Sequence, residues 1–500
     1  MSATDGNHPL LGEEEHEGEA GHQLSSPSTA LSNTCKAIIG SGCIALSDAF
    51  RQSGWVVGVV GLFGMAFISE LTMRQLVLCN QAVRKRKKQD RKREGIEGSS
   101  SHDEECTFTD IGRISYGKWG AGAADFTMLT CQFGACCAAL AFIAQGLGDV
   151  IDGTDPTRLI VLMVSGVVAL GLTLLRSTAM LEHTSGLGNA IFLVSIVMVV
   201  YIGSSGTGAR DCIPQAVLDT SLVNQCLNNV TVPPPAACPT GIHCNAKFYD
   251  TANGIYEPPS SGDGAKPTLA GRVGATDIAG FAQFFGVALY MFSAHSEVMA
   301  IEQFVADKEG FPKVLRKAVA IACVVYTFFG LFGYFTWGAA TGFPDHGDPS
   351  DIGKHIGDIF QNIGSSRLAD AVRALMCFMI MCNYPLMAFG AVQDLEHHLL
   401  PNETATMGSW VAGKRMVLRT IWVVASCLVV IATNFKFAFL VAFTGNFSNC
   451  VMAFTLPPIF YLELYPEKKE DPLTFYGNWA LSISTFIIAM VFTVIGVMAL

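Results

Sequence analysis

Charged residues are scarce in this sequence. Asp, Glu, Lys and Arg make up 15% of its 500 residues, whereas half of the residues are hydrophobic and the mean hydropathy is +0.39. This composition disfavours a soluble multidomain protein. The net charge of −10 argues against a nucleic-acid partner, because nucleic acids bind basic surfaces.

Signatures of catalysis are also missing. The sequence contains no Walker loop, no His-Glu-x-x-His motif and no Gly-x-Ser-x-Gly motif, and its polar segments are short. A primary ATP-driven pump, a membrane hydrolase and an enzyme in general therefore lack support. We expect no cofactor and no resident metal.

Long apolar runs dominate the chain instead. A membrane helix needs about 20 mostly apolar residues, and eleven runs meet this requirement. The sequence thus predicts an all-α polytopic membrane protein that sits in a lipid bilayer, and it does not indicate an oligomeric state. The expected spans are 35–54, 55–80, 119–147, 159–176, 187–204, 276–304, 317–341, 367–392, 417–434, 437–462 and 476–500.

The distribution of basic residues predicts the orientation. Residues 1–33 are acidic and contain no Lys or Arg, so they form an uncleaved disordered tail rather than a signal peptide. Ten of the 32 Lys and Arg fall in the loop 81–118. Basic loops stay in the cytosol. We therefore expect a cytosolic amino terminus, and the odd span count then places the carboxyl terminus outside.

The segment 205–275 lies between the fifth and sixth spans and is expected on the extracellular or lumenal side. It contains an N-glycosylation sequon at Asn229. Four cysteines share this oxidising side and are candidates for two disulfides, although the sequence does not choose among the three pairings. These cysteines are Cys212, Cys226, Cys238 and Cys244.

Two spans contain polar breaks at mid-membrane depth. The first holds Gly40-Ser41-Gly42, and the sixth holds Ser293, His295 and Ser296. Glycine lets a helix unwind and expose backbone groups to a solute, although close helix packing would also explain the small residues. Because the breaks lie five spans apart, in the first and the sixth, we expect a five-plus-five inverted repeat with the eleventh helix outside it.

Four segments, in order along the chain, resemble the amino acid/auxin permease family. They read AIIGSGCIALSDAFRQSGW from residue 37, AHSEV from 294, FPKVL from 311 and NYPLMAF from 383. The first two are similar to the system A and system N neutral amino acid transporters, and AHSEV matches their Cys-His-Pro-Glu-Val stretch. The resemblance implies a LeuT-like fold, with helices 1–5 in 34–204, helices 6–10 in 276–462, and a short loop and helix 11 in 463–500.

The expected substrate site combines the two breaks. We predict that the carboxylate of an amino acid binds the freed amides of Gly40, Ser41 and Gly42, next to Ile39. The ammonium should meet carbonyls near Ser293 and His295, with Ser296 beside them. Asn383, two residues before Pro385 in the eighth span, either lines the pathway or satisfies the carbonyl that the proline kink frees. His295 has a simpler alternative role as a hydrogen-bonded interior histidine.

Two charged residues depart from the family pattern and bear on the coupling ion. Lys36 stands where sodium-coupled relatives place an Asn, and an ammonium there would repel Na⁺. Proton coupling is therefore favoured, with Na⁺ as the alternative. Asp48 is a second candidate proton acceptor and leaves a cationic substrate open. Alternatively, Lys36 only extends to the cytosolic interface.

These observations predict a secondary active transporter that carries a small neutral amino acid by proton-coupled symport and alternating access. The alternatives are a sodium-coupled symporter and a non-transporting amino acid sensor of the same fold. The stretch DGNHPLLGEEE near the amino terminus only approximates an acidic dileucine sorting signal. We therefore place the plasma membrane ahead of a vacuolar or lysosomal membrane.

Overall fold

The computed structural model describes residues 26–93, 106–151, 153–174, 178–205, 278–303, 305, 307–337, 367–399 and 410–498, and these residues are almost entirely helical. The predicted disulfide cysteines and Asn229 lie outside this described part of the chain, as does most of the acidic tail.

The helices follow the predicted spans closely. The first half of the chain contains α1 (Pro27–Ile38), η1 (Ser41–Ala45), α2 (Leu46–Ser53), α3 (Trp55–Arg93), α4 (Phe108–Ile151), α5 (Asp155–Leu174) and α6 (Thr178–Ser205). The second half contains α8 (Ile278–Met291), α9 (His295–Gln303), α10 (Phe311–Trp337), α12 (Arg367–Leu399), α13 (Trp410–Ala432), α14 (Phe437–Thr444), η8 (Gly445–Asn449), η9 (Val451–Thr455), α15 (Leu456–Leu464), η10 (Pro466–Lys469) and α16 (Pro472–Met498).

The all-α membrane architecture is confirmed at the level of composition and length. Within the described part of the chain, eight helices are long and apolar enough to cross a membrane. The first predicted span is interrupted and its two helices are each too short by themselves. The apolar part of α6, Ile191–Ser204, is also short. The count of eleven spans stays a prediction.

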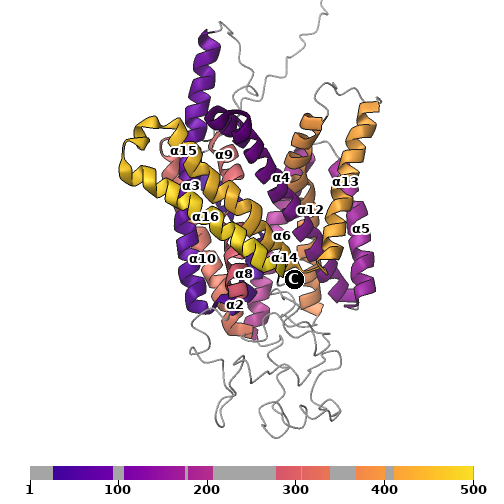
Figure 1. The fold of residues 1–500 in the computed structure, drawn as a ribbon. Coiled ribbons are helices and arrows are strands. Elements are labelled where there is room, and N and C mark those ends of the chain that lie inside the picture. Colours follow the sequence, from indigo (N-terminus) through magenta and orange to yellow (C-terminus); the bar gives the residue numbers. More distant parts are fainter. Residues whose placement is uncertain are drawn as a thin grey trace, which may run out of the picture.

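The tenth predicted span lies at the centre of the bundle. It comprises α14, η8, η9 and α15, and 83% of its most apolar window is buried, against 17% for α16. In Figure 1, α16 crosses obliquely over the other helices, and α5 and α13 stand together at one edge. The buried core lies between these two sides and includes residues of α1, α2, α4, α8, α10, α12 and α14.

The central span departs from regular α-helix where it meets the sixth span. Gly445–Asn449 and Val451–Thr455 are π-helical, a conformation that is rare and often found at functional sites. Gly445 and Gly286 let the backbones of the two spans approach closely, because a Cβ at Gly445 would lie 1.8 Å from the carbonyl oxygen of Gly286. Side chains on η8 therefore reach the break in the sixth span.

Ion pairs connect the ends of several helices. Arg373 contacts Asp370 at 3.1 Å on α12, as its spacing predicts. The Glu70 carboxylate of α3 lies 3.3 Å from Arg316 of α10. A neighbouring helix thus supplies its cation, although Arg74 stands one turn along α3 at a spacing that also allows a pair.

Candidate functional site

The first span breaks where the sequence predicts. Helix α1 ends at Ile38, and Ile39 (φ −79°, ψ 99°) and Gly40 (φ −122°, ψ −175°) are extended before η1 begins at Ser41. The first hydrogen bond of the new turn joins the Cys43 N–H to the Gly40 carbonyl. The amides of Ser41 and Gly42 precede that bond and lack an intrahelical acceptor, as at any helix start.

The sixth span also breaks, although it has neither Gly nor Pro at the interruption. Helix α8 ends at Met291 and α9 begins at His295. Two side-chain hydroxyls donate hydrogen bonds to backbone carbonyls at this break. Ser293 donates to the Tyr290 carbonyl (2.7 Å), and Ser69 donates to the Phe292 carbonyl (2.7 Å). These bonds compensate the lost helical bonds and allow the break to form.

Tyr326 of α10 connects the two breaks. Its side chain is 1% exposed, and its hydroxyl lies 2.5 Å from the carbonyl oxygen of Ile38 and 3.4 Å from that of Met291. These are the last residues of α1 and α8. One phenol thus contacts the carboxyl-terminal ends of both broken helices, a role that the sequence analysis did not identify.

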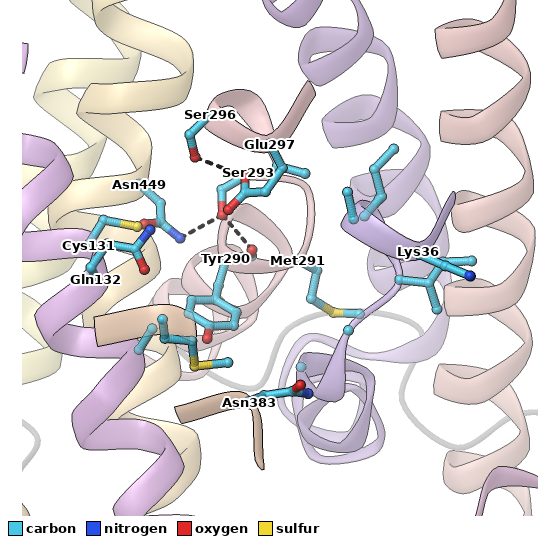
Figure 2. A pocket seen from close by; sticks show the side chains of 18 of the residues that line it. Lys36, Cys131, Gln132, Tyr290, Met291, Ser293, Ser296, Glu297, Asn383 and Asn449 are labelled. Atoms are coloured by element: carbon cyan, nitrogen blue, oxygen red, sulfur yellow. Dashed lines mark hydrogen bonds between the residues drawn. The ribbon is translucent and has the colours of Figure 1, made fainter. Parts of the chain in front are cut away.

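A cavity of about 220 Å³ lies between the two breaks. Of the predicted site residues, Lys36, Ile39, Gly40, Gly42, Ser293, Ser296 and Asn383 line it. Figure 2 shows Ser293 near the middle of this cavity, with Asn383 and Asn449 contributed by other helices. The structure therefore brings together residues from α1, η1, the sixth-span break and α12.

His295 does not line the cavity. Its ring is 1% exposed, and its Nε2 lies 2.9 Å from the hydroxyl of Thr72 on α3. That hydroxyl donates to the Ile68 carbonyl, so the imidazole is the donor between the two side chains and the ring is held with a proton on Nε2. This arrangement matches the simpler alternative, a histidine that packs the interior and orients α9 against α3.

Asp48 also lies away from the cavity. Its buried carboxylate accepts hydrogen bonds from Arg51 (2.9 and 3.0 Å), Gln52 (3.2 Å) and Gln283 (3.1 Å). Four donors and an adjacent cation stabilise the ionised carboxylate and leave little access for a solute. Its contacts join α2 to α8.

Lys36 occupies the last turn of α1 and not the start of a membrane helix. Its side chain is exposed and lines the cavity. In Figure 2, its ammonium lies on the side of the cavity away from Ser293 and Glu297. The carboxyl-terminal end of α1 favours this positive charge through the helix dipole.

Several residues that line the cavity were not predicted from the sequence to contact the substrate. Tyr290, Cys131, Gln132 and Asn449 line the wall opposite Lys36 in Figure 2, and Glu297 lines the cavity at the first turn of α9. Cys131 and Gln132 stand in an apolar stretch of α4 without any local signal. Asn449 could have been found from the sequence, because a polar amide within an apolar span usually has a hydrogen-bonding partner.

The fold and the site define a class: a polytopic helical membrane protein with a solute-sized cavity between two interrupted helices. Residues 23–213 and 262–500 match the family described as transmembrane amino acid transporter protein. The chain belongs to this amino acid/auxin permease family.

Relatives cover nearly the whole chain. It is 23% identical to Amino acid transporter ANT1 of Arabidopsis thaliana, over 99% of this chain and 97% of that protein. It is also 23% identical to Sodium-coupled neutral amino acid transporter 4 of Homo sapiens, over 98% of this chain and 85% of that protein. Among solved structures it is similar to MhsT in complex with L-phenylalanine, with 10% identity, a TM-score of 0.39 and coverage of 95% and 99% of the two chains.

Proposed function

We propose that this protein is a secondary active transporter that moves a small neutral amino acid by proton-coupled symport. The observation that supports this function is the cavity of about 220 Å³ between the two interrupted helices, in a chain of an amino acid transporter family. Interrupted helices at mid-membrane expose backbone donors and acceptors to a polar solute, which continuous helices do not.

The two ends of a zwitterion find different partners in this cavity. The carboxylate binds the amides of Gly40, Ser41 and Gly42, where the positive end of the η1 and α2 turns favours an anion. The ammonium lies toward Ser293 and the carboxyl-terminal end of α8, where the helix dipole favours a cation. The cavity is smaller than the sites of about 300–1,000 Å³ that hold drug-sized ligands, so a small amino acid is the best match.

Alternating access follows from an arrangement of eleven spans with a five-plus-five inverted repeat. Each break occurs in the first span of one half, and α3, α4, α5 and α6 separate the two. The peripheral α16 is the helix outside the repeat. Rocking of one half against the other about the fixed cavity would expose it to each side in turn.

Lys36 is the better candidate for proton coupling. It lines the cavity, whereas Asp48 would have to break its contacts with Arg51, Gln52 and Gln283 to exchange a proton with a solute. The positive charge of Lys36 at the cavity would repel Na⁺. The name of the sodium-coupled human relative keeps Na⁺ as the alternative ion.

Uptake of labelled alanine into liposomes that contain only this protein tests the function. We expect accumulation driven by an inward proton gradient with choline in place of sodium. Binding without accumulation would indicate the sensor, and accumulation that strictly requires sodium would return the coupling to Na⁺. Liposomes without protein give the baseline.

A further inference from the structure

We propose that Glu297 and Asn449 form a subsite for an ammonium group of the substrate. This inference rests on the proposed function, but it assigns the cation-accepting groups to side chains of α9 and η8. Neither residue was predicted to bind substrate.

Glu297 is a carboxylate without a countercharge. Its side chain is exposed and lines the cavity, and the Ser296 hydroxyl donates to its Oε2 at 2.9 Å. Within the described part of the chain, no Lys or Arg lies within ion-pair distance of it. An unpaired acid inside a membrane bundle is costly and marks a functional position whose partner must be supplied.

Asn449 provides a second acceptor, and its orientation follows from its neighbours. The Ser293 hydroxyl uses its proton on the Tyr290 carbonyl, so its oxygen must accept from Asn449, whose Nδ2 lies 2.8 Å away. The Oδ1 atom then remains free. Asn449 is fully buried, and its Oδ1 has no hydrogen-bond partner among the described residues.

The backbone carbonyls of the break are less available than these two side chains. Those of Tyr290 and Phe292 already accept from Ser293 and Ser69, and that of Met291 lies 3.4 Å from the Tyr326 hydroxyl. A primary ammonium has three donors and one positive charge, which match a free amide oxygen and an uncompensated carboxylate. A neutral hydroxyl would satisfy the amide but would leave the charge of Glu297 unpaired.

The ammonium can be the α-ammonium of any amino acid or the side-chain ammonium of a diamino acid, and two probes distinguish these sources. We would measure KM for alanine and for ornithine in proteoliposomes that contain the unmutated protein, Glu297→Gln or Asn449→Ala. A loss of affinity for both probes assigns the α-ammonium. A loss confined to ornithine assigns the side-chain ammonium.

The expected rise in KM is roughly tenfold to a hundredfold for Glu297→Gln, because a hydrogen bond to a charged group is lost. Glu297→Asp keeps the charge and should recover much of the affinity. Asn446→Ala is the matched control. Asn446 shares η8 and also has a free buried Oδ1, but it donates to the Ala282 carbonyl and does not line the cavity.

Thermal stabilisation of the purified protein by each probe separates binding from folding. Without ligand, Glu297→Gln should melt as the unmutated protein does, whereas Asn449→Ala should melt lower because it removes the buried hydrogen bond to Ser293. Both variants should lose the shift that alanine or ornithine induces. Unchanged KM and unchanged shifts would overturn the proposal. A loss of sodium stimulation in these variants with unchanged KM for both probes would also overturn the proposal, because the oxygens of Glu297 and Asn449 would then bind Na⁺. If the unmutated protein accumulates neither probe, the proposed transport fails, while a ligand-induced shift that Glu297→Gln abolishes still supports the subsite.

Discussion

Gly42 lines the cavity at a position where any side chain would meet its neighbours. A Cβ there would lie 3.2 Å from Tyr290 Cδ1 and 3.2 Å from Met291 Cγ. We expect Gly42→Leu to abolish alanine uptake with normal surface expression, and Gly42→Ala to reduce it about tenfold, because overpacking costs about 1–3 kcal/mol.

The matched control is Gly64→Leu on α3, where a Cβ meets nothing within 4 Å. Gly40→Ala is also informative, because a Cβ at Gly40 meets no protein atom within 4 Å and its φ of −122° suits any residue. A defect in Gly40→Ala would therefore report space that the substrate needs. Full transport by Gly42→Leu would exclude the site at the first break.

Lys36 carries the prediction about coupling. In the unmutated protein, uptake should rise as the outer pH becomes acidic, because a larger inward proton gradient then drives the coupled transport. Lys36→Ala should flatten this pH response while the protein still binds alanine. Uptake measured in choline from pH 5 to pH 8 checks the effect.

Lys85→Ala is the control for that experiment. Lys85 is an exposed lysine at the basic end of α3 and does not line the cavity. An unaltered pH profile in Lys36→Ala would show that Lys36 acts only as a cation at the helix terminus, as the simpler alternative holds.

The Tyr326 hydroxyl connects α10 to the carboxyl-terminal ends of the two interrupted helices, α1 and α8. Tyr326→Phe removes a hydroxyl that contacts the carbonyls of Ile38 and Met291 and leaves them buried with fewer donors. The expected loss of stability is about 1–3 kcal/mol. The melting temperature in detergent and the KM for alanine should both change, since the same bonds position the cavity walls.

Tyr476→Phe serves as the comparison, because Tyr476 lies on peripheral α16 and is 70% exposed. It should leave stability and KM unchanged. If Tyr326→Phe lowers the melting temperature but not the affinity, the phenol stabilises the bundle without positioning the site.

The whole molecule must choose one orientation in the membrane. The basic end of α3 contacts residues of other helices: Lys87 pairs with Asp110 at 2.8 Å, and Arg84 lies 3.7 Å from the buried carboxylate of Glu302. If this end faces the cytosol, the segment 205–275 faces the opposite side. In a eukaryotic host, Asn229 should then be glycosylated.

Endoglycosidase treatment checks this orientation. We expect a faster-migrating band for the unmutated protein and no change for Asn229→Gln. Unchanged mobility of the unmutated protein would contradict the assignment of the loop to the outer side. The same host also shows whether the protein reaches the plasma membrane or an internal one.

Periodicity and composition were enough to locate the helices, because membrane spans need long apolar runs whatever their neighbours are. Among the described residues, each of the eleven predicted ranges overlaps a helical segment, and the number of spans stays a prediction. The break in the first span was also predicted, because a second polar break in the sixth span favoured an unwound helix over close packing of the glycines. The break in the sixth span was identified with less local support, since Ser293 and the Ser69 hydroxyl stabilise it and Ser69 is far away in the sequence.

The sequence by itself determined the class of protein, the family and the segments that contribute to the cavity. Only the tertiary structure decided which polar residues face it. His295 and Asp48 are ionisable residues near the breaks, yet they form hydrogen bonds with Thr72 and Arg51 and do not line the cavity. Asn449 on the π-helical η8 and Glu297 in the first turn of α9 line the cavity. Side-chain direction depends on such packing between spans, and linear spacing does not encode it.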